Sequence, residues 1–85
     1  MGRSHRVRPK RLGAKLLAIR ERLDLTQPEL IKALNVKGAR LHPASISLYE
    51  SGEREPSLIV LLRYARLAKV PMETLVDDEL NLPRK

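Results

Sequence analysis

The side chains that could perform covalent or metal chemistry are few in this chain, and their spacing does not suit such chemistry. The sequence has no cysteine and two histidines, His5 and His42, which are too distant from each other to form a local zinc motif. The serines between Ser45 and Ser57 lack the Gly-x-Ser-x-Gly setting of a hydrolase nucleophile, and only His42 stands near enough to serve as their base. We therefore expect no enzyme activity, no metal and no cofactor.

Positive charge is the chemistry that the sequence does supply, and it is concentrated at one end. The first 22 residues contain eight Lys or Arg against one Glu, a balance of +7, which equals the net charge of the whole chain. A basic block of this kind can bind nucleic acid, an anionic membrane surface or an acidic protein, or it can solubilise a tail. Charge alone does not decide among these roles.

The length of the chain limits the scaffold that can position these side chains. A chain of 85 residues forms one domain with a small core. Phe and Trp are absent, so that core must be built from Leu, Ile, Val and Ala. No run of 18 apolar residues and no leader with a cleavage pattern is visible. We expect a cytoplasmic protein with no membrane partner.

Apolar spacing predicts helices in the first half of the chain. Residues 1–9 lack any periodicity and are expected to form a flexible basic arm. A first helix, ending near Asp24, is indicated by four apolar residues on one face: Leu12, Leu16, Ile19 and Leu23. Thr26 and Glu29 form a capping box that starts a second helix, and Asn35 ends it. The inward residues of the second helix are expected to be Leu30, Ile31 and Leu34.

Capping residues also predict where helices begin and end in the second half of the chain. A third helix is predicted over residues 43–51, with Ile46 and Tyr49 inward and Gly52 as its stop. Ser57 can cap a fourth helix, and residues 71–76 form a short fifth one. The expected inward face of the fourth helix is Leu58, Leu61, Leu62, Ala65 and Ala68. We expect an all-α domain of five helices over residues 10–78 and a C-terminal tail over residues 79–85.

Three short motifs point to a known family. LTQ at residues 25–27 opens the second helix, ISLYESG at 46–52 covers the third, and PS at 56–57 precedes the fourth. With the segments around them, these motifs make residues 12–76 resemble the helix-turn-helix family of Cro and the phage repressors, called the XRE family. The resemblance implies a lambda-repressor-like DNA-binding domain and a sequence-specific transcriptional regulator that inserts its third helix in the major groove.

The resemblance also implies roles for single residues. Arg20 and Glu50 occupy the places of a structural ion pair in the family, and Gln27 occupies that of a residue near a DNA phosphate. The positions that face bases or phosphates in relatives are Ala44, Ser45, Ser47 and Leu48. Because the third helix carries no Arg, Asn or Gln, it lacks bidentate base readout, and specificity must come in part from elsewhere.

The connection between the second and third helices departs from the family pattern. Nine residues, Lys37 to Ser45, separate Val36 from Ile46, which is longer than in relatives, and Ile31 stands where relatives favour a small alanine. We interpret the stretch as a lengthened turn that relieves crowding at Ile31 and places cations beside the third helix. The alternative is a tolerated surface insertion. The added DNA contacts would be Lys37, Arg40 and His42.

Cations outside the helices complete the predicted DNA contacts. We expect the basic arm to enter the adjacent minor groove, with a solvated tail as the alternative. The residues concerned are Arg3, Arg6 and Arg8 in the arm and Lys10 directly after it. Arg54, in the turn after the third helix, is expected to reach the DNA backbone. The alternative is a solvated cation next to Glu53 and Glu55.

Two apolar residues suggest how the chain assembles, and a second class of function stays open. Ile59 and Val60 stand where the family usually has polar residues, so we predict that they form a homodimer interface. The alternative is packing against the fifth helix or the tail. The leading hypothesis is a repressor that binds double-stranded DNA at the nucleoid. The alternative is a protein-interaction module, such as an antitoxin that binds a toxin partner and autoregulates its operon.

Overall fold

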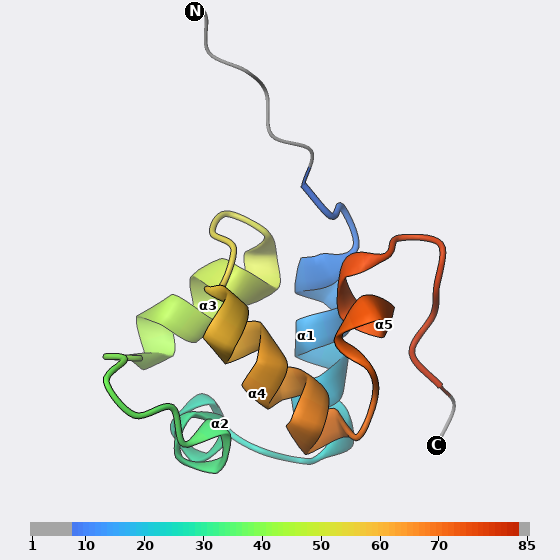
Figure 1. The fold of residues 1–85 in the computed structure, drawn as a ribbon. Coiled ribbons are helices and arrows are strands. Elements are labelled where there is room, and N and C mark those ends of the chain that lie inside the picture. The colour runs from blue at the N-terminus through green and yellow to red at the C-terminus, as the bar shows by residue number, and fades with distance from the viewer. Residues whose placement is uncertain (1–7, 84–85) are drawn as a thin grey trace, which may run out of the picture.

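The computed structural model describes residues 8–83, and this part of the chain contains five α-helices and no strand. The helices are α1 (Leu12–Arg22), α2 (Gln27–Leu34), α3 (Pro43–Ser51), α4 (Leu58–Ala68) and α5 (Met72–Val76). The α1 helix contacts α3, α4 and α5, and α4 also contacts α2 (Figure 1). The expected all-α fold is therefore confirmed. None of these helices is long and apolar enough to cross a membrane.

Local capping explains where most helices begin and end. The Thr26 hydroxyl accepts from the Glu29 N–H, and the Glu29 carboxylate accepts from the Thr26 N–H, so the predicted capping box is present. Asn35 and Gly52 end α2 and α3 in the left-handed conformation, with φ of 51° and 84°. The Ser57 hydroxyl caps α4 by accepting from the Val60 N–H. These predictions are confirmed.

The core is aliphatic apart from its two tyrosines. Five helices contribute to one cluster of buried residues: Leu12, Leu16, Ile19, Leu30, Leu34, Ile46, Tyr49, Val60, Leu61, Tyr64, Ala65 and Leu75. The inward residues predicted for α3, Ile46 and Tyr49, are confirmed, and Ile31 on α2 is half-buried against the same cluster. Leu23 was expected to be inward but is 40% exposed, because α1 ends at Arg22.

The inward face predicted for α4 is wrong in part. Val60 and Tyr64 are buried, whereas Leu58 is 74% exposed and Leu62 is only half-buried. All five residues from 58 to 62 are apolar, so their spacing allows more than one helical phase, and packing against the other helices selects the one that buries Val60. The expectation that Val60 is exposed and available to a dimer interface is therefore corrected. Ile59 is exposed, at 58%.

The segment after α5 returns along α1. The Asp78 carboxylate accepts hydrogen bonds from the backbone N–H groups of Lys10 and Arg11, at 2.9 and 3.0 Å. It thereby satisfies two backbone donors at the start of α1, where the N-cap residue makes no side-chain hydrogen bond. Arg11 donates to the Asp78 carbonyl, and Arg22 donates to that of Pro83. Leu82 packs against the core. Residues 79–83, which the sequence placed in a tail, thus lie against the domain.

A buried lysine joins α1 to α5. Lys15 is 4% exposed, and its Nζ donates to the carbonyls of Thr74 and Asp77 at 2.7 and 2.9 Å. These carbonyls lie at the C-terminal end of α5, where a helix leaves acceptors unsatisfied. Burial, assisted by Arg11, lowers the pKa of Lys15. Lys15 belongs to the basic N-terminal block of the sequence, but its role in the domain is therefore to stabilise the fold.

Gly13 sets how closely α1 approaches α3. A Cβ at this position would lie 2.8 Å from the Glu50 carbonyl oxygen, 2.9 Å from that of Tyr49 and 3.1 Å from the Gly52 nitrogen. All three atoms belong to the backbone at the end of α3, so no flexible side chain can move aside. The crossing of the two helices requires glycine here.

We predict that Gly13→Ala destabilises the domain, although alanine in a helix interior normally stabilises by about 1 kcal/mol relative to glycine. The backbone contacts should outweigh that gain and leave a loss of about 1–3 kcal/mol. Chemical denaturation measures the free energy of unfolding, and Ala14→Ser, at the next and exposed position, is the control. A variant as stable as the wild type would show that α1 and α3 separate without cost.

We predict that the contribution of Asp78 to stability depends on pH. The N–H groups of Lys10 and Arg11 hold the pKa of its carboxyl below the usual value, so the folded state favours the ionised form. The contribution is complete above the unfolded-state pKa and is lost as the pH falls through the folded-state pKa. Urea denaturation of the wild type and Asp78→Ala should show a difference at pH 7 that shrinks below pH 4. A difference that stays constant over this range would contradict the prediction.

Candidate nucleic-acid interface

The α3 helix has one face in the core and one face in solvent. Ile46 is fully buried and Tyr49 is 7% exposed, because residues three apart share a helix face. Ser47 lies between them in sequence and is exposed. Of the other predicted contact residues on this helix, Ala44 is exposed, whereas Ser45 and Leu48 are half-buried. The outer face therefore presents small and hydroxyl-bearing side chains.

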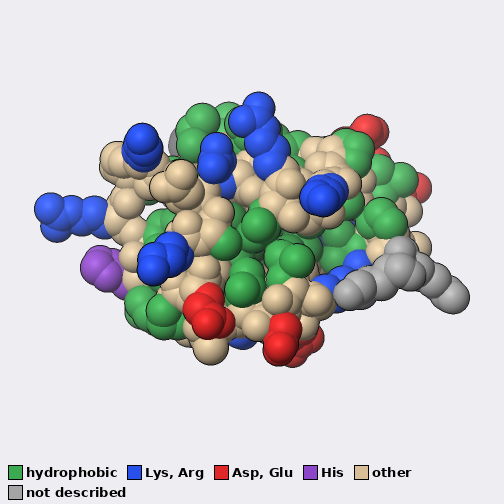
Figure 2. All heavy atoms as spheres, turned by 90° about the horizontal axis from the view of Figure 1, so that it is seen from below, with side chains coloured by type: hydrophobic (Ala, Val, Ile, Leu, Met, Phe, Trp, Pro, Cys, Tyr) green, Lys and Arg blue, Asp and Glu red, His purple; other side chains and the backbone are tan. Residues whose placement is uncertain are grey.

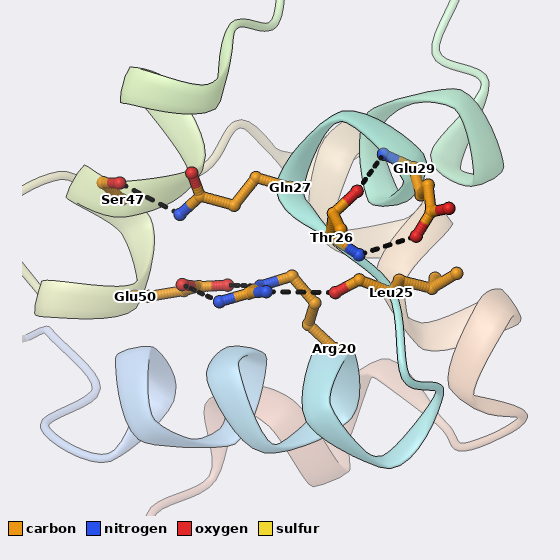
Figure 3. Close-up of polar contacts among 7 residues, drawn as sticks. All are labelled: Arg20, Leu25, Thr26, Gln27, Glu29, Ser47 and Glu50. Carbon is orange, nitrogen blue, oxygen red and sulfur yellow. Dashed lines mark hydrogen bonds and ion pairs between the residues drawn. The ribbon is translucent and has the colours of Figure 1, made fainter.

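An ion pair fixes α3 against α1. Arg20 on α1 donates from Nε to Glu50 Oε2 at 2.7 Å and from a second nitrogen to Oε1 at 3.1 Å (Figure 3). A third nitrogen of Arg20 donates to the Leu25 carbonyl at 3.0 Å. Both side chains are largely buried, and the hydrogen bonds to Glu50 raise the pKa of Arg20. Arg20 and Glu50, which the family resemblance assigned to a structural pair, are thus in direct contact, and Arg20 also holds the turn that leads into α2.

The first residue of α2 contacts the outer face of α3. The Gln27 side chain points toward Ser47, and its Nε2 donates to the Ser47 Oγ at 3.0 Å (Figure 3). The backbone of Gln27 is held by the capping box at Thr26 and Glu29. The sequence indicated that Gln27 lies near a phosphate, and this stays a prediction. The sequence did not reveal the contact with Ser47, since the two residues are distant in the chain.

The long connection between α2 and α3 is anchored by its apolar residues and extends its cations outward. Val36 and Leu41 pack against the core, whereas the three predicted contact residues Lys37, Arg40 and His42 are exposed. His42 lies directly before α3, and its backbone N–H donates to the Ser45 hydroxyl. In Figure 1 the loop projects beyond the start of α3, and Figure 2 shows a His and several Lys or Arg side chains at this end of the molecule.

A second group of cations lies at the other end of α3. Arg8, Lys10 and Arg54 line one groove of about 700 Å³ between the start of α1 and the turn after α3. Arg8 also lies 3.5 Å from the Glu55 carboxylate, an ion pair at the surface, which contributes little to stability. The structure thus brings together three predicted contact residues from two segments. Arg3 and Arg6 of the predicted arm lie outside the described residues.

Several cations of the N-terminal block do not take part in this surface. Arg11, Lys15, Arg20 and Arg22 all donate hydrogen bonds within the domain. Their contacts are to residues late in the chain or to α3, so sequence spacing carried no signal for them. Arg63 on α4 was missed for the same reason, and it donates to the Leu34 carbonyl at the end of α2. The charge available to a partner is therefore smaller at α1 than the sequence indicated.

The comparisons with known proteins agree with this arrangement. The family model described as helix-turn-helix matches residues 16–75, a range that begins within α1 and ends within α5. No curated protein and no solved structure gives a significant match.

Proposed function

The chain belongs to the helix-turn-helix family of Cro and the phage repressors, the XRE family of DNA-binding regulators, and we propose that it represses transcription by occupying specific sites on duplex DNA. The observation that carries this proposal is the placement of α3. Its outer face is free of bulky charge, and cations stand at both of its ends. In this role the protein would be associated with the nucleoid.

The dimensions of α3 suit the major groove. An α-helix with its side chains is about 10–12 Å across, and the major groove is about 12 Å wide, so the nine-residue α3 can enter it. With α3 in the groove, Lys37, Arg40 and His42 reach the phosphates near its start. Arg54, Arg8 of the arm and Lys10 reach the phosphates near its end. Contacts of both groups with phosphate would hold the helix in register without reading the sequence.

Sequence readout falls to the outer face of α3. The hydroxyls of Ser45 and Ser47 can bond base edges, and Ala44 and Leu48 can contact thymine methyl groups. Gln27, at the start of α2, lies beside this face and can reach a phosphate as well as Ser47. Single hydroxyl contacts discriminate less than bidentate ones, so the loop and the arm must contribute to the choice of site.

A homodimer would supply the remaining affinity. Ile59 is 58% exposed and its neighbour Leu58 is 74% exposed, at the start of α4. Exposed apolar residues that are adjacent favour a contact with a second copy, and a symmetric contact of this kind pairs with a near-palindromic site. Val60, the other residue that the sequence assigned to the interface, is buried in the core and is not part of this surface.

The experiment that tests the proposed function is selection from a pool of random-sequence duplexes at two salt concentrations, followed by sequencing. Recovery of a motif with two-fold symmetry at both salt concentrations would support a dimeric, sequence-specific regulator. Retention that yields no motif and disappears at the higher salt concentration would mean that charge alone drives binding. That outcome would contradict the proposal and favour a protein-interaction module.

We predict that the double variant Lys37→Ala/Arg40→Ala binds its site more weakly and with a lower salt dependence. Each lost phosphate contact should reduce the slope of log K against log salt by about 0.9, so the two together should reduce it by about 1.8. Fluorescence anisotropy over a salt series measures both quantities. Arg66→Ala, which removes an exposed cation from α4, is the control and should keep the slope. Equal slopes for the double variant and the wild type would leave the loop as a tolerated insertion.

We predict that Ile59→Asp shifts the protein from dimer to monomer, because a buried aspartate facing its symmetry mate would be unpaired. Sedimentation equilibrium measures the association constant, and circular dichroism checks the fold. Leu80→Asp makes the same change at another exposed apolar residue and should leave association unchanged. An Ile59→Asp protein that associates as the wild type does would exclude the start of α4 as the interface.

A further inference from the structure

A cavity lies between the end of α1, the end of α4 and the C-terminal segment, at the opposite end of α1 from the groove that Arg8, Lys10 and Arg54 line. Its volume is about 350 Å³, which lies in the range of small-molecule sites. Figure 2 views the domain from the side where α1 and α4 end, and it shows hydrophobic side chains there with Lys and Arg around them. The apolar lining is aliphatic and includes Ile19, Leu23, Leu67, Ala68, Val70 and Leu82. The cavity can therefore accept an apolar group.

The charged residues at this cavity are all positive. Arg22 and Lys69 line it, and no carboxylate of the described residues does. Arg22 uses one nitrogen to donate to the Pro83 carbonyl at 2.6 Å, but a guanidinium has five N–H groups, so others remain for a ligand. The Lys69 ammonium has no hydrogen bond or ion pair within residues 8–83. An anionic group bound here would therefore meet two available cations.

The backbone of Lys69 adopts a conformation that lysine does not favour. Lys69 ends α4 with φ of 61°, in the left-handed region. The same conformation ends α2 and α3 at Asn35 and Gly52, which are the residue types that tolerate it well. Residues held in such unfavourable conformations are concentrated at ligand sites. The lysine at this position is thus a second feature, independent of the cavity itself, that points to a ligand.

We propose that this cavity binds a medium-chain fatty acid anion, with its carboxylate at Arg22 and Lys69 and its chain against the aliphatic lining. The guanidinium and the ammonium suit a carboxylate, and the lining offers no aromatic ring for stacking. The chain would cover Leu23, which is 40% exposed, and so remove apolar surface from water. This inference goes beyond the proposed function, because the ligand binds away from the DNA contacts.

The first measurement is an NMR titration of the full chain, labelled with ¹⁵N, with sodium octanoate at constant ionic strength and without DNA. The amide signals of Leu23, Lys69, Val70 and Leu82 should shift and reach saturation. Sodium hexanoate, which has two fewer CH₂ groups, should shift the same signals and bind more weakly. Each CH₂ group that enters the cavity should change the affinity by about fourfold, so the two together should change it by up to about fifteenfold.

The variant Lys69→Gly tests the role of the cation. Glycine adopts the left-handed conformation readily, so α4 should end as in the wild type, and circular dichroism checks the fold. The affinity for octanoate should fall by about two- to fivefold, the range for one ion pair at the surface. Octanol, which has no charge, should bind the variant and the wild type equally. Arg66→Ala removes an exposed cation of the same helix that does not line the cavity, and this matched control should keep the affinity for octanoate.

Three results would overturn the inference. Equal affinities for hexanoate and octanoate would mean that charge alone attracts the ligand and that its chain stays outside the cavity. Signals that shift at Leu58 and Ile59 instead would place octanoate on the other exposed apolar surface of the domain. An unchanged octanoate affinity of Lys69→Gly would show that this cation does not hold the carboxylate. Because DNA is absent from these measurements, their outcome does not depend on whether the proposed function holds.

Discussion

The pairing of Arg20 with Glu50 is the interaction on which the arrangement of this domain depends. One guanidinium holds the Glu50 carboxylate with two hydrogen bonds and the Leu25 carbonyl with a third. It thereby ties α1, the turn before α2 and the end of α3 to one rigid group, and the planar guanidinium suits such multiple contacts. Gly13 allows the two helices to cross without a side chain between them. The orientation of α3 is thus set at both a charged and a steric contact.

The α3 helix itself carries few side chains that could bind DNA strongly. The outer face of α3 has small residues and serines, and the groups that complete it come from its neighbours. Gln27 reaches it from α2, the loop supplies Lys37 and Arg40 near its start, and Arg54 lies past its end. If the proposed function holds, specificity depends on the relative positions of four segments. Changes in the loop would then alter recognition without altering α3.

The positive charge of the chain serves two different purposes. Arg11 and Arg22 hold the returning C-terminal segment, and Lys15 satisfies the carbonyls at the end of α5. These groups stabilise the fold. Other cations, such as Lys37 and Arg40, are exposed and available to an anionic partner. A net charge of +7 does not separate the two sets, because only the contacts of each side chain show which purpose it serves.

The sequence by itself determined the features that depend on neighbouring residues. Capping at Thr26 and Ser57 and the stops at Asn35 and Gly52 could be predicted because the hydrogen bonds and backbone angles involved extend over only a few residues. The inward positions of α3 followed from helical spacing. The family motifs added the Arg20 pairing, which spacing alone could not supply.

Only the tertiary structure decided the features that join distant segments. The apolar run at residues 58–62 is compatible with several phases of α4, and burial of Val60 was selected by the helices packed against it. The close approach at Gly13, the return of residues 79–83 along α1 and the contact of Gln27 with Ser47 likewise join residues far apart in the chain. Sequence periodicity shows that a helix has an apolar face, but packing against its partners determines which residues that face buries.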